Sequence, residues 1–260
     1  MRQFLAPSNP DERGILHLTG KDYRYFRQVL RVKTGDMAAV RFSDGTLQNM
    51  TVCKVDEALR FLELQVCAGS KTITRGTQAS ALEKQDIEYW LFQFVARPQK
   101  MDIIIRQAAE CGIQKIIQVT GAYTQQTAGA RQDRAERIIK EARQQSGSPV
   151  NTVCEAPCTL EKALELWKEK TDSEPNAAAA FALYERTEKT QLLQAALKKY
   201  ETVKIAAIAV GCEGGISPEE MSILQESGFI PIHFETNILR CETAAIYGIA
   251  ALQSALTGMN

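Results

Sequence analysis

The sequence predicts an α/β protein in two parts, a small β domain followed by a larger domain with a parallel sheet. Short β-rich runs with turn signals fill residues 36–67, and a polar stretch over 69–85 separates them from alternating apolar strands and amphipathic helices. A length of 260 residues suits about two domains. Apolar residues make up 45% and charged residues 24%, which disfavours disorder, collagen and a coiled-coil rod.

The front part is predicted to be a compact β-barrel. Its strands are predicted at Met37–Phe42, Met50–Val55 and Phe61–Val66, with turns at Ser43-Asp44-Gly45 and Asp56-Glu57. We therefore expect a β domain over residues 1–70, a linker over 71–86 and the α/β domain over 87–260.

The rear part alternates strands and helices. Strands of the buried parallel type are predicted at Tyr89–Ala96, Lys115–Val119, Ala178–Tyr184, Val203–Val210 and Ile230–Phe234. Helices are predicted at Met101–Cys111, Arg131–Ser146, Thr159–Lys170, from Ser217 to Gly228, and over 242–256 before Gly258. Ser217 and Glu220 form a capping box around Pro218, which fixes where the fourth of these helices begins.

Basic residues concentrate in the front part. Residues 1–76 carry 12 Lys and Arg against 8 Asp and Glu, a net +4 that the remainder balances. Six of the basic residues fall within 21 positions: Lys21, Arg24, Arg27, Arg31, Lys33 and Arg41. This density favours either a solvated face or a surface that neutralises phosphates, and charge alone leaves both open.

Cysteine and histidine usage excludes several classes of site. The seven cysteines contain no Cys-x-x-Cys pair, and only two histidines are present. Cys154 and Cys158 could form half of a zinc site, but no second half follows, so we expect no metal. Reduced thiols and the lack of any apolar run near 20 residues long favour a cytoplasmic protein without a membrane partner.

A glycine-rich loop follows the strand Val203–Val210. Its residues are Gly211-Cys212-Glu213-Gly214-Gly215, and the chain contains neither the dinucleotide-binding Gly-x-Gly-x-x-Gly nor a P-loop motif. Ligands in open α/β sheets bind at the carboxyl ends of strands, and glycines let the backbone approach them closely. The loop is either a ligand-binding loop or a tight turn.

A second loop follows the strand Ile230–Phe234 and runs through residues 235–244 to the last helix. Both loops are expected at the same edge of the sheet and therefore at one pocket. Arg240 would present a fixed cation there, unless it forms a salt bridge with a nearby carboxylate.

These two loops resemble the paired motifs GPEGG…E and LGxRILRTETA of the RsmE family, which methylates N3 of a uracil in small-subunit ribosomal RNA and belongs to the SPOUT superfamily. Weaker resemblances follow in the same order along the chain: Val29-Leu30-Arg31 with Gly35-Asp36 to HLxxVLRxxxGD, Lys100-Met101-Asp102 with Glu110 to KMD…KATELGV, and Glu141-Ala142 with Gln145-Ser146 to EAxEQS.

The resemblance implies a SPOUT domain with a trefoil knot, a PUA-like front barrel, a homodimer, and S-adenosylmethionine as methyl donor. It implies Arg240 as the catalytic residue and cofactor contacts from Leu183, Gly211, Glu213, Gly214, Ile238, Leu239, Arg240, Thr243 and Ala244. It also implies that Arg24, Arg27 and Arg31 bind 16S ribosomal RNA or the small ribosomal subunit.

The chain departs from the family pattern at Cys212 in place of proline, Glu235 in place of glycine and Asn237 in place of arginine. A glutamate is unfavourable where a glycine has a positive φ, and it could crowd a cofactor. An alternative function is therefore a catalytically impaired SPOUT-like RNA-binding protein. A third is a small-molecule enzyme with no affinity for RNA.

Overall fold

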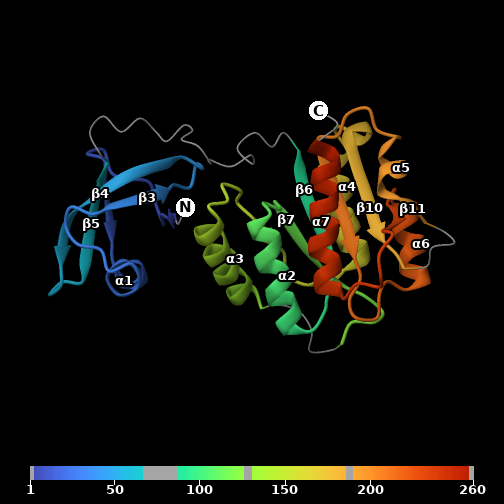
Figure 1. Ribbon diagram of the computed structural model, residues 1–260, viewed down its shortest axis with the longest axis horizontal. Coiled ribbons are helices and arrows are strands. Elements are labelled where there is room, and N and C mark those ends of the chain that lie inside the picture. The colour runs from blue at the N-terminus through green and yellow to red at the C-terminus, as the bar shows by residue number, and fades with distance from the viewer. Residues whose placement is uncertain (1–2, 67–86, 126–130, 186–189, 258–260) are drawn as a thin grey trace. The chain divides into compact units, whose positions relative to one another are not determined.

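The structure, a computed structural model, describes residues 3–66, 87–125, 131–185 and 190–257 (Figure 1). Contacts within the chain divide it into two compact units: Met1–Glu83 with Arg143–Pro149, and Lys84–Ala142 with Val150–Asn260. The linker expected at 71–86 and the boundary expected after residue 70 lie outside the described residues. The three predicted domain ranges therefore stay predictions.

A five-stranded sheet forms the front unit, in the order β1-β3-β4-β5-β2. The strands are β1 (Phe4–Leu5), β2 (Ile15–Leu18), β3 (Met37–Arg41), β4 (Leu47–Asp56) and β5 (Phe61–Val66). The three predicted strands are confirmed as β3, β4 and β5, whereas β1 and β2 are too short to show a pattern in the sequence. Within the described ranges no pairing joins β1 to β2, so closure into a barrel stays a prediction.

A helical segment covers this sheet. Helix α1 (Gly20–Arg24) continues into a π-helical stretch (Tyr25–Val29), where Phe26 is fully buried and its ring meets Phe4 edge-on at 4.8 Å. The segment ends at Arg31, whose φ of 54° is left-handed. Because the Val32 amide donates back to the Phe26 carbonyl at 3.1 Å, a capping turn fixes this conformation.

The rear unit contains an eight-stranded sheet in which every pair is parallel. The order is β11-β13-β10-β12-β6-β7-β8, with β9 also paired to β7. The strands are β6 (Glu88–Phe94), β7 (Lys115–Thr120), β8 (Val153–Cys154), β9 (Cys158–Thr159), β10 (Ala178–Leu183), β11 (Gln191–Leu192), β12 (Ile205–Val210) and β13 (Ile230–His233). The α/β class and the five predicted parallel strands are confirmed.

Helices connect these strands. They are α2 (Pro98–Glu110), α3 (Gln132–Ser146), α4 (Leu160–Thr171), the short α5 (Leu193–Leu197), α6 (Pro218–Glu226) and α7 (Cys241–Thr257). Helix α2 begins before the predicted Met101 because Pro98 occupies its first turn. The expected helix stop at Gly258 lies outside the described residues. Of the helices that the structure describes, none is long and apolar enough to cross a bilayer.

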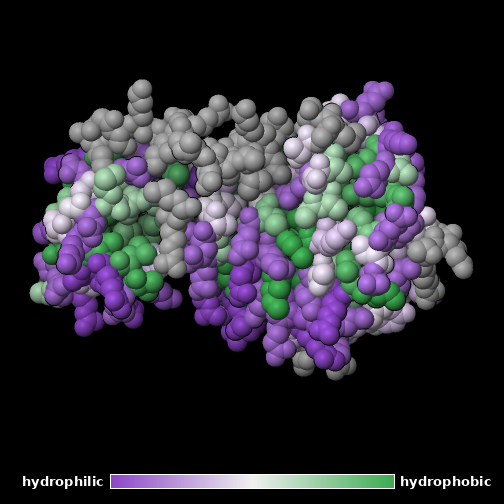
Figure 2. Space-filling model, in the orientation of Figure 1, coloured by the Kyte–Doolittle hydropathy of each residue, from purple (hydrophilic) through white to green (hydrophobic). Residues whose placement is uncertain are grey.

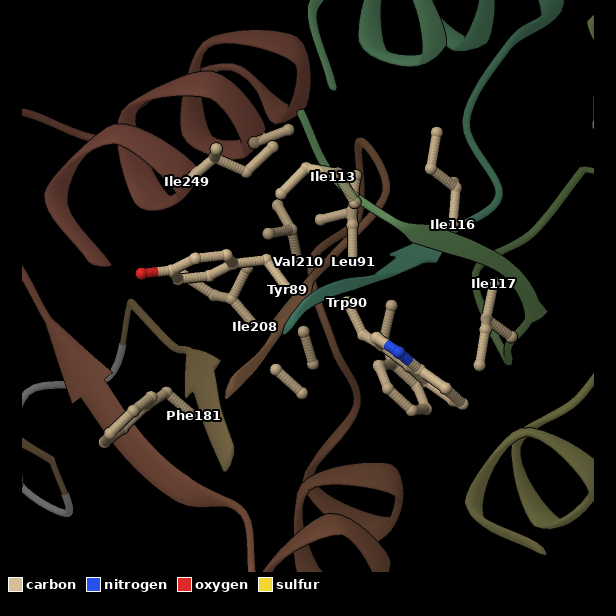
Figure 3. Close-up of a cluster of buried hydrophobic side chains, with 14 of the residues drawn as sticks. Tyr89, Trp90, Leu91, Ile113, Ile116, Ile117, Phe181, Ile208, Val210 and Ile249 are labelled. Atoms are coloured by element: carbon tan, nitrogen blue, oxygen red, sulfur yellow. The ribbon is translucent and has the colours of Figure 1, made fainter. Parts of the chain in front are cut away.

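The core of the rear unit lies on both faces of the sheet. Tyr89 and Trp90 point to opposite sides of β6 (Figure 3), as successive strand residues must. Trp90 and Trp167 of α4 pack edge-on at 5.5 Å, and Phe92 meets the ring of Phe229 at 5.1 Å. Helices α2 and α7 pack together on one side (Figure 1). Figure 2 shows the hydrophilic outer faces of α2 and α3.

The capping box predicted at α6 is confirmed. The Ser217 amide donates to Glu220 Oε2 at 2.9 Å, and the Glu220 amide donates to Ser217 Oγ at 3.2 Å. The other oxygen, Glu220 Oε1, accepts the Ala122 amide at 2.6 Å from the loop after β7. One buried carboxylate thus joins the start of α6 to a neighbouring loop.

We expect Glu220→Ala to lower the free energy of unfolding by about 2 kcal/mol, because it leaves the buried Ser217 amide and the partly buried Ala122 amide without their acceptor. Urea denaturation followed by tryptophan fluorescence measures this change, since both tryptophans lie in the core of the rear unit. Glu219→Ala, an exposed neighbour in the same helical turn, is the control and should change stability by less than about 0.5 kcal/mol. Equal effects of the two variants would contradict the assigned role of Glu220.

Candidate functional site

A cavity of about 540 Å³ lies at the carboxyl ends of β10, β12 and β13. Leu183 ends β10, Val210 ends β12 and His233 ends β13, and all three line the cavity. The glycine-rich loop after β12 and the loop after β13 form much of its wall. The two loops therefore share one pocket, as predicted, and its volume suits a small organic ligand.

The glycine-rich loop is a tight turn that only glycine fits at its first position. The Gly215 amide donates to the Cys212 carbonyl at 3.0 Å, and Gly215 has a φ of 79°. A Cβ on Gly211 would lie 2.6 Å from the carbonyl carbon of Gly215, a contact that backbone atoms cannot relieve easily. The two interpretations of this loop are thus compatible, because the turn is tight and its backbone lines the cavity.

A buried glutamine fixes the strand end from which this loop departs. The side-chain amide of Gln93, at the end of β6, donates to the carbonyls of Val210 and Gly211 at 3.3 and 3.2 Å. Gln93 is completely buried. The start of the loop is therefore anchored to the neighbouring strand.

The second loop presents Ile238, Leu239 and Arg240 to the cavity. The Ala244 amide donates to the Arg240 carbonyl at 2.7 Å, so Arg240 directly precedes α7. Across the described ranges, Arg240 forms no ion pair with a carboxylate. The salt-bridge alternative finds no support there, and the guanidinium is available to a ligand.

A lysine from α2 reaches both loops. Lys100 Nζ lies 3.6 Å from Glu213 Oε1 in the glycine-rich loop and 3.2 Å from Glu242 Oε2 at the start of α7. Burial alone would lower the pKa of Lys100, but Glu242, Cys241 and Glu213 outweigh it and raise the pKa above its ordinary value. The ammonium therefore stays charged at neutral pH.

The neighbouring Cys241 thiol is unreactive at neutral pH. Burial, followed by its hydrogen bond to Glu242, raises its pKa to about 12. Its Sγ lies 3.7 Å from Lys100 Nζ and 3.4 Å from Glu242 Oε2. Since the thiolate is the reactive form, Cys241 is not a nucleophile at neutral pH.

Most of the expected cofactor residues line this cavity: Leu183, Gly211, Glu213, Gly214, Ile238, Leu239, Arg240 and Ala244. Thr243 is exposed in the first turn of α7 and is not part of the lining. Lys100 is the functional candidate that the sequence pattern did not single out, although it belongs to a recognised motif. Its position in the first turn of the helix after β6, next to β12, was the available signal.

Glu235 does not obstruct the cavity. It is exposed and absent from the lining, whereas Asn237 is part of the lining. Arg31 and Arg60 are the non-glycine residues with positive φ in the described part of the chain, so Glu235 is not in the left-handed region. The backbone strain expected from replacing a glycine is therefore absent at this position.

Some of the basic residues of the front unit form contacts within the unit. Arg24 and Arg31 are exposed, whereas Arg27 donates to the Val32 carbonyl at 2.6 Å and pairs with Glu57. Arg41 is buried and donates to Gln3 Oε1 at 2.7 Å, so its charge is removed from the predicted surface. Hydrophilic side chains gather over α1 in Figure 2.

The expectation of no metal stays a prediction. Among the residues that the structure describes, no three His, Cys, Asp or Glu side chains form a group that could bind a metal ion. Cys154 lies on β8 and Cys158 on β9.

The family model and the most similar relatives of this chain agree on one family. Residues 83–253 match the family model described as an RNA methyltransferase domain. The chain is 24% identical to the ribosomal RNA small subunit methyltransferase E 2 of Borreliella burgdorferi, over 95% of this chain and 93% of that protein. It is 31% identical to the ribosomal RNA small subunit methyltransferase E of Aquifex aeolicus, over 63% of this chain and 67% of that protein.

A solved structure shares the fold. The crystal structure of a ribosomal RNA small subunit methyltransferase E from Neisseria gonorrhoeae bound to S-adenosyl methionine superposes with a TM-score of 0.76. The two chains are 22% identical, and the similarity covers 98% of this chain and 97% of that chain.

We expect Cys241 in the folded protein to react with iodoacetamide at pH 8 at least about 100-fold more slowly than exposed Cys53, because its thiolate is scarce and buried. Peptide mass spectrometry measures each site separately. The raised pKa also means that this thiol stabilises the fold below pH 9 and loses that contribution as the pH rises toward 12. Similar rates at both sites before unfolding in urea would contradict the assignment.

Proposed function

Because this chain belongs to the RsmE family of ribosomal RNA small subunit methyltransferases, we propose that it is an enzyme that methylates small-subunit ribosomal RNA with S-adenosylmethionine as methyl donor. The acceptor is N3 of a uracil in 16S ribosomal RNA. The observation that carries the proposal is one cavity that both motif loops line, with Arg240 in its wall and no carboxylate paired to Arg240 among the described residues.

The residues present fit the proposed cofactor. The tight turn at Gly211 lets backbone atoms approach a ligand, and Glu185 adds a carboxylate to the lining, which suits the positive charges of S-adenosylmethionine. The bound cofactor supplies an activated methyl group. Leu183 and Leu239 supply apolar surface to the pocket, and Ile238, which is 89% exposed, offers apolar surface that a ligand would cover.

Arg240 is the proposed catalytic residue. When N3 gives its proton to solvent, the uracil ring carries negative charge, and the Arg240 guanidinium in the cavity wall stabilises that charge as it develops. Glu213 accepts the Arg97 amide at 3.2 Å and pairs with Lys100, so its carboxylate acts in shaping the loop. The target base must leave its stack to reach the cavity, at a cost of a few kcal/mol.

The proposal includes a SPOUT domain with a trefoil knot and a PUA-like front barrel that binds RNA through Arg24, Arg27 and Arg31. It also includes a homodimer and a cytoplasmic location. Strands β12 and β13 flank β10 on opposite sides, so the chain between them crosses from one side of β10 to the other. This crossing supports the knot. The exposure of Arg24 and Arg31 supports the RNA surface.

The alternative, an RNA-binding protein without cofactor affinity, drew its support from Glu235 and Asn237. The position of Glu235 outside the cavity weakens it. A small-molecule enzyme is distinguished by RNA affinity, because it predicts none that depends on salt.

We expect S-adenosylmethionine to bind with a dissociation constant in the micromolar range by calorimetry, and Arg240→Ala to slow methyl transfer about 100-fold or more at saturating cofactor. Mass spectrometry of nucleosides from small-subunit ribosomal RNA measures the product. Arg137→Ala, an exposed arginine on α3, is the control and should leave the rate unchanged.

Two results would contradict this proposal in different ways. Binding that is undetectable at millimolar cofactor supports the impaired RNA-binding protein. A normal rate in Arg240→Ala refutes the catalytic assignment alone.

Arg31 allows a test of RNA binding that leaves the fold intact. Since its φ is left-handed, Arg31→Gly should keep or raise the free energy of unfolding, by up to about 1 kcal/mol, measured by calorimetry. Affinity for small-subunit ribosomal RNA should fall several-fold, with a shallower salt dependence. Arg31→Lys, which keeps the charge, should bind nearly as the original protein does, and equal binding by all three proteins would exclude Arg31 from the RNA surface.

A further inference from the structure

Lys100 connects the two loops that line the cavity. It lies on α2, Glu213 lies in the glycine-rich loop, and Glu242 lies in the first turn of α7, after the second loop. One ammonium group contacts both carboxylates, at 3.6 and 3.2 Å. We propose that Lys100 is a positioning residue that sets the spacing of the two loops and thereby the affinity for S-adenosylmethionine; this inference rests on the proposed function.

The arrangement depends on the lysine charge. Two carboxylates that approach one nitrogen also lie close to each other, so they repel when the ammonium is removed. The side chains of Lys100, Glu213 and Glu242 are 25%, 31% and 19% exposed, which limits screening by solvent. Burial alone would raise the pKa of Glu242, but its own amide and Lys100 lower it, so the carboxylate is charged at neutral pH.

Lys100 is anchored on a rigid element. Helix α2 packs against α7, and Gln253 Nε2 of α7 donates to the Cys111 carbonyl at the end of α2 at 2.9 Å. The Arg97 amide, just before α2, also donates to Glu213. The start of α2 therefore fixes the glycine-rich loop through two contacts, and it fixes the start of α7 through Lys100.

The contacts of Lys100 indicate positioning and not proton transfer. Its nitrogen faces two carboxylates and a thiol, and its raised pKa prevents it from releasing a proton at neutral pH. Its removal should therefore weaken cofactor binding and leave the chemical step largely intact once the cofactor is bound.

The test compares cofactor affinity with maximal rate. We expect Lys100→Met to raise the dissociation constant for S-adenosylmethionine about tenfold by calorimetry, while kcat at saturating cofactor stays within about twofold. Adding Glu242→Gln to Lys100→Met should recover part of the affinity, because it removes one of the two repelling charges. Lys162→Met is the control. It breaks the exposed ion pair between Lys162 and Glu165 on α4 and should leave the dissociation constant and kcat unchanged.

The outcomes separate this inference from the proposed function. If the original protein binds the cofactor and Lys100→Met binds it equally well, the inference fails and the function stands. If the original protein does not bind the cofactor, the function fails. Hydrogen exchange then tests the inference: faster exchange of amides 211–215 and 241–244 in Lys100→Met supports the connection, and unchanged exchange overturns it. If Lys100→Met does not fold, Glu242→Gln alone must change affinity or exchange, or the inference is wrong.

Discussion

The parallel pairing of β10 with β12 and β13 is the constraint on which the rest of the structure depends. Ala182 is in register with Ala209 on one side and with Pro231 on the other, so the three strands end together at one edge of the sheet. The loops after β12 and β13 therefore begin at the same edge of the sheet, one on each side of β10. A shift of register would separate them and divide the cavity, because strand pairing fixes where each loop departs.

Small side chains let a helix support this edge. Strands β10 and β12 are rich in alanine, and Gly248 of α7 lies so close that an added Cβ would be 2.7 Å from Ile208 Cδ1 and 3.0 Å from Leu183 Cδ1. Leu183 also lines the cavity. The close packing of α7 thus bears directly on the shape of the pocket, since interiors of this density transmit small displacements.

The sequence predicted the long elements and the two cavity loops because these depend on local patterns. Apolar runs marked the central strands, and Ser217 with Glu220 marked the start of α6. Strands β8, β9 and β11 were not predicted, because each has only two residues and so shows no periodicity. The role of Lys100 could not be predicted from the sequence, because its carboxylate partners lie more than 100 positions away in the chain. Charge density overstated the basic surface, since it could not reveal that Arg41 is buried beside Gln3.

The protonated state of Cys241 has a consequence for selectivity toward the acceptor. For the proposed methyl donor, a thiolate in the pocket wall would compete with the nucleic acid for the methyl group, and the protein would inactivate itself. Burial and the adjacent Glu242 carboxylate keep the sulfur in its neutral form, with a pKa of about 12. Burial and the neighbouring carboxylates thereby protect the pocket from self-alkylation, while the Lys100 charge acts in the opposite direction.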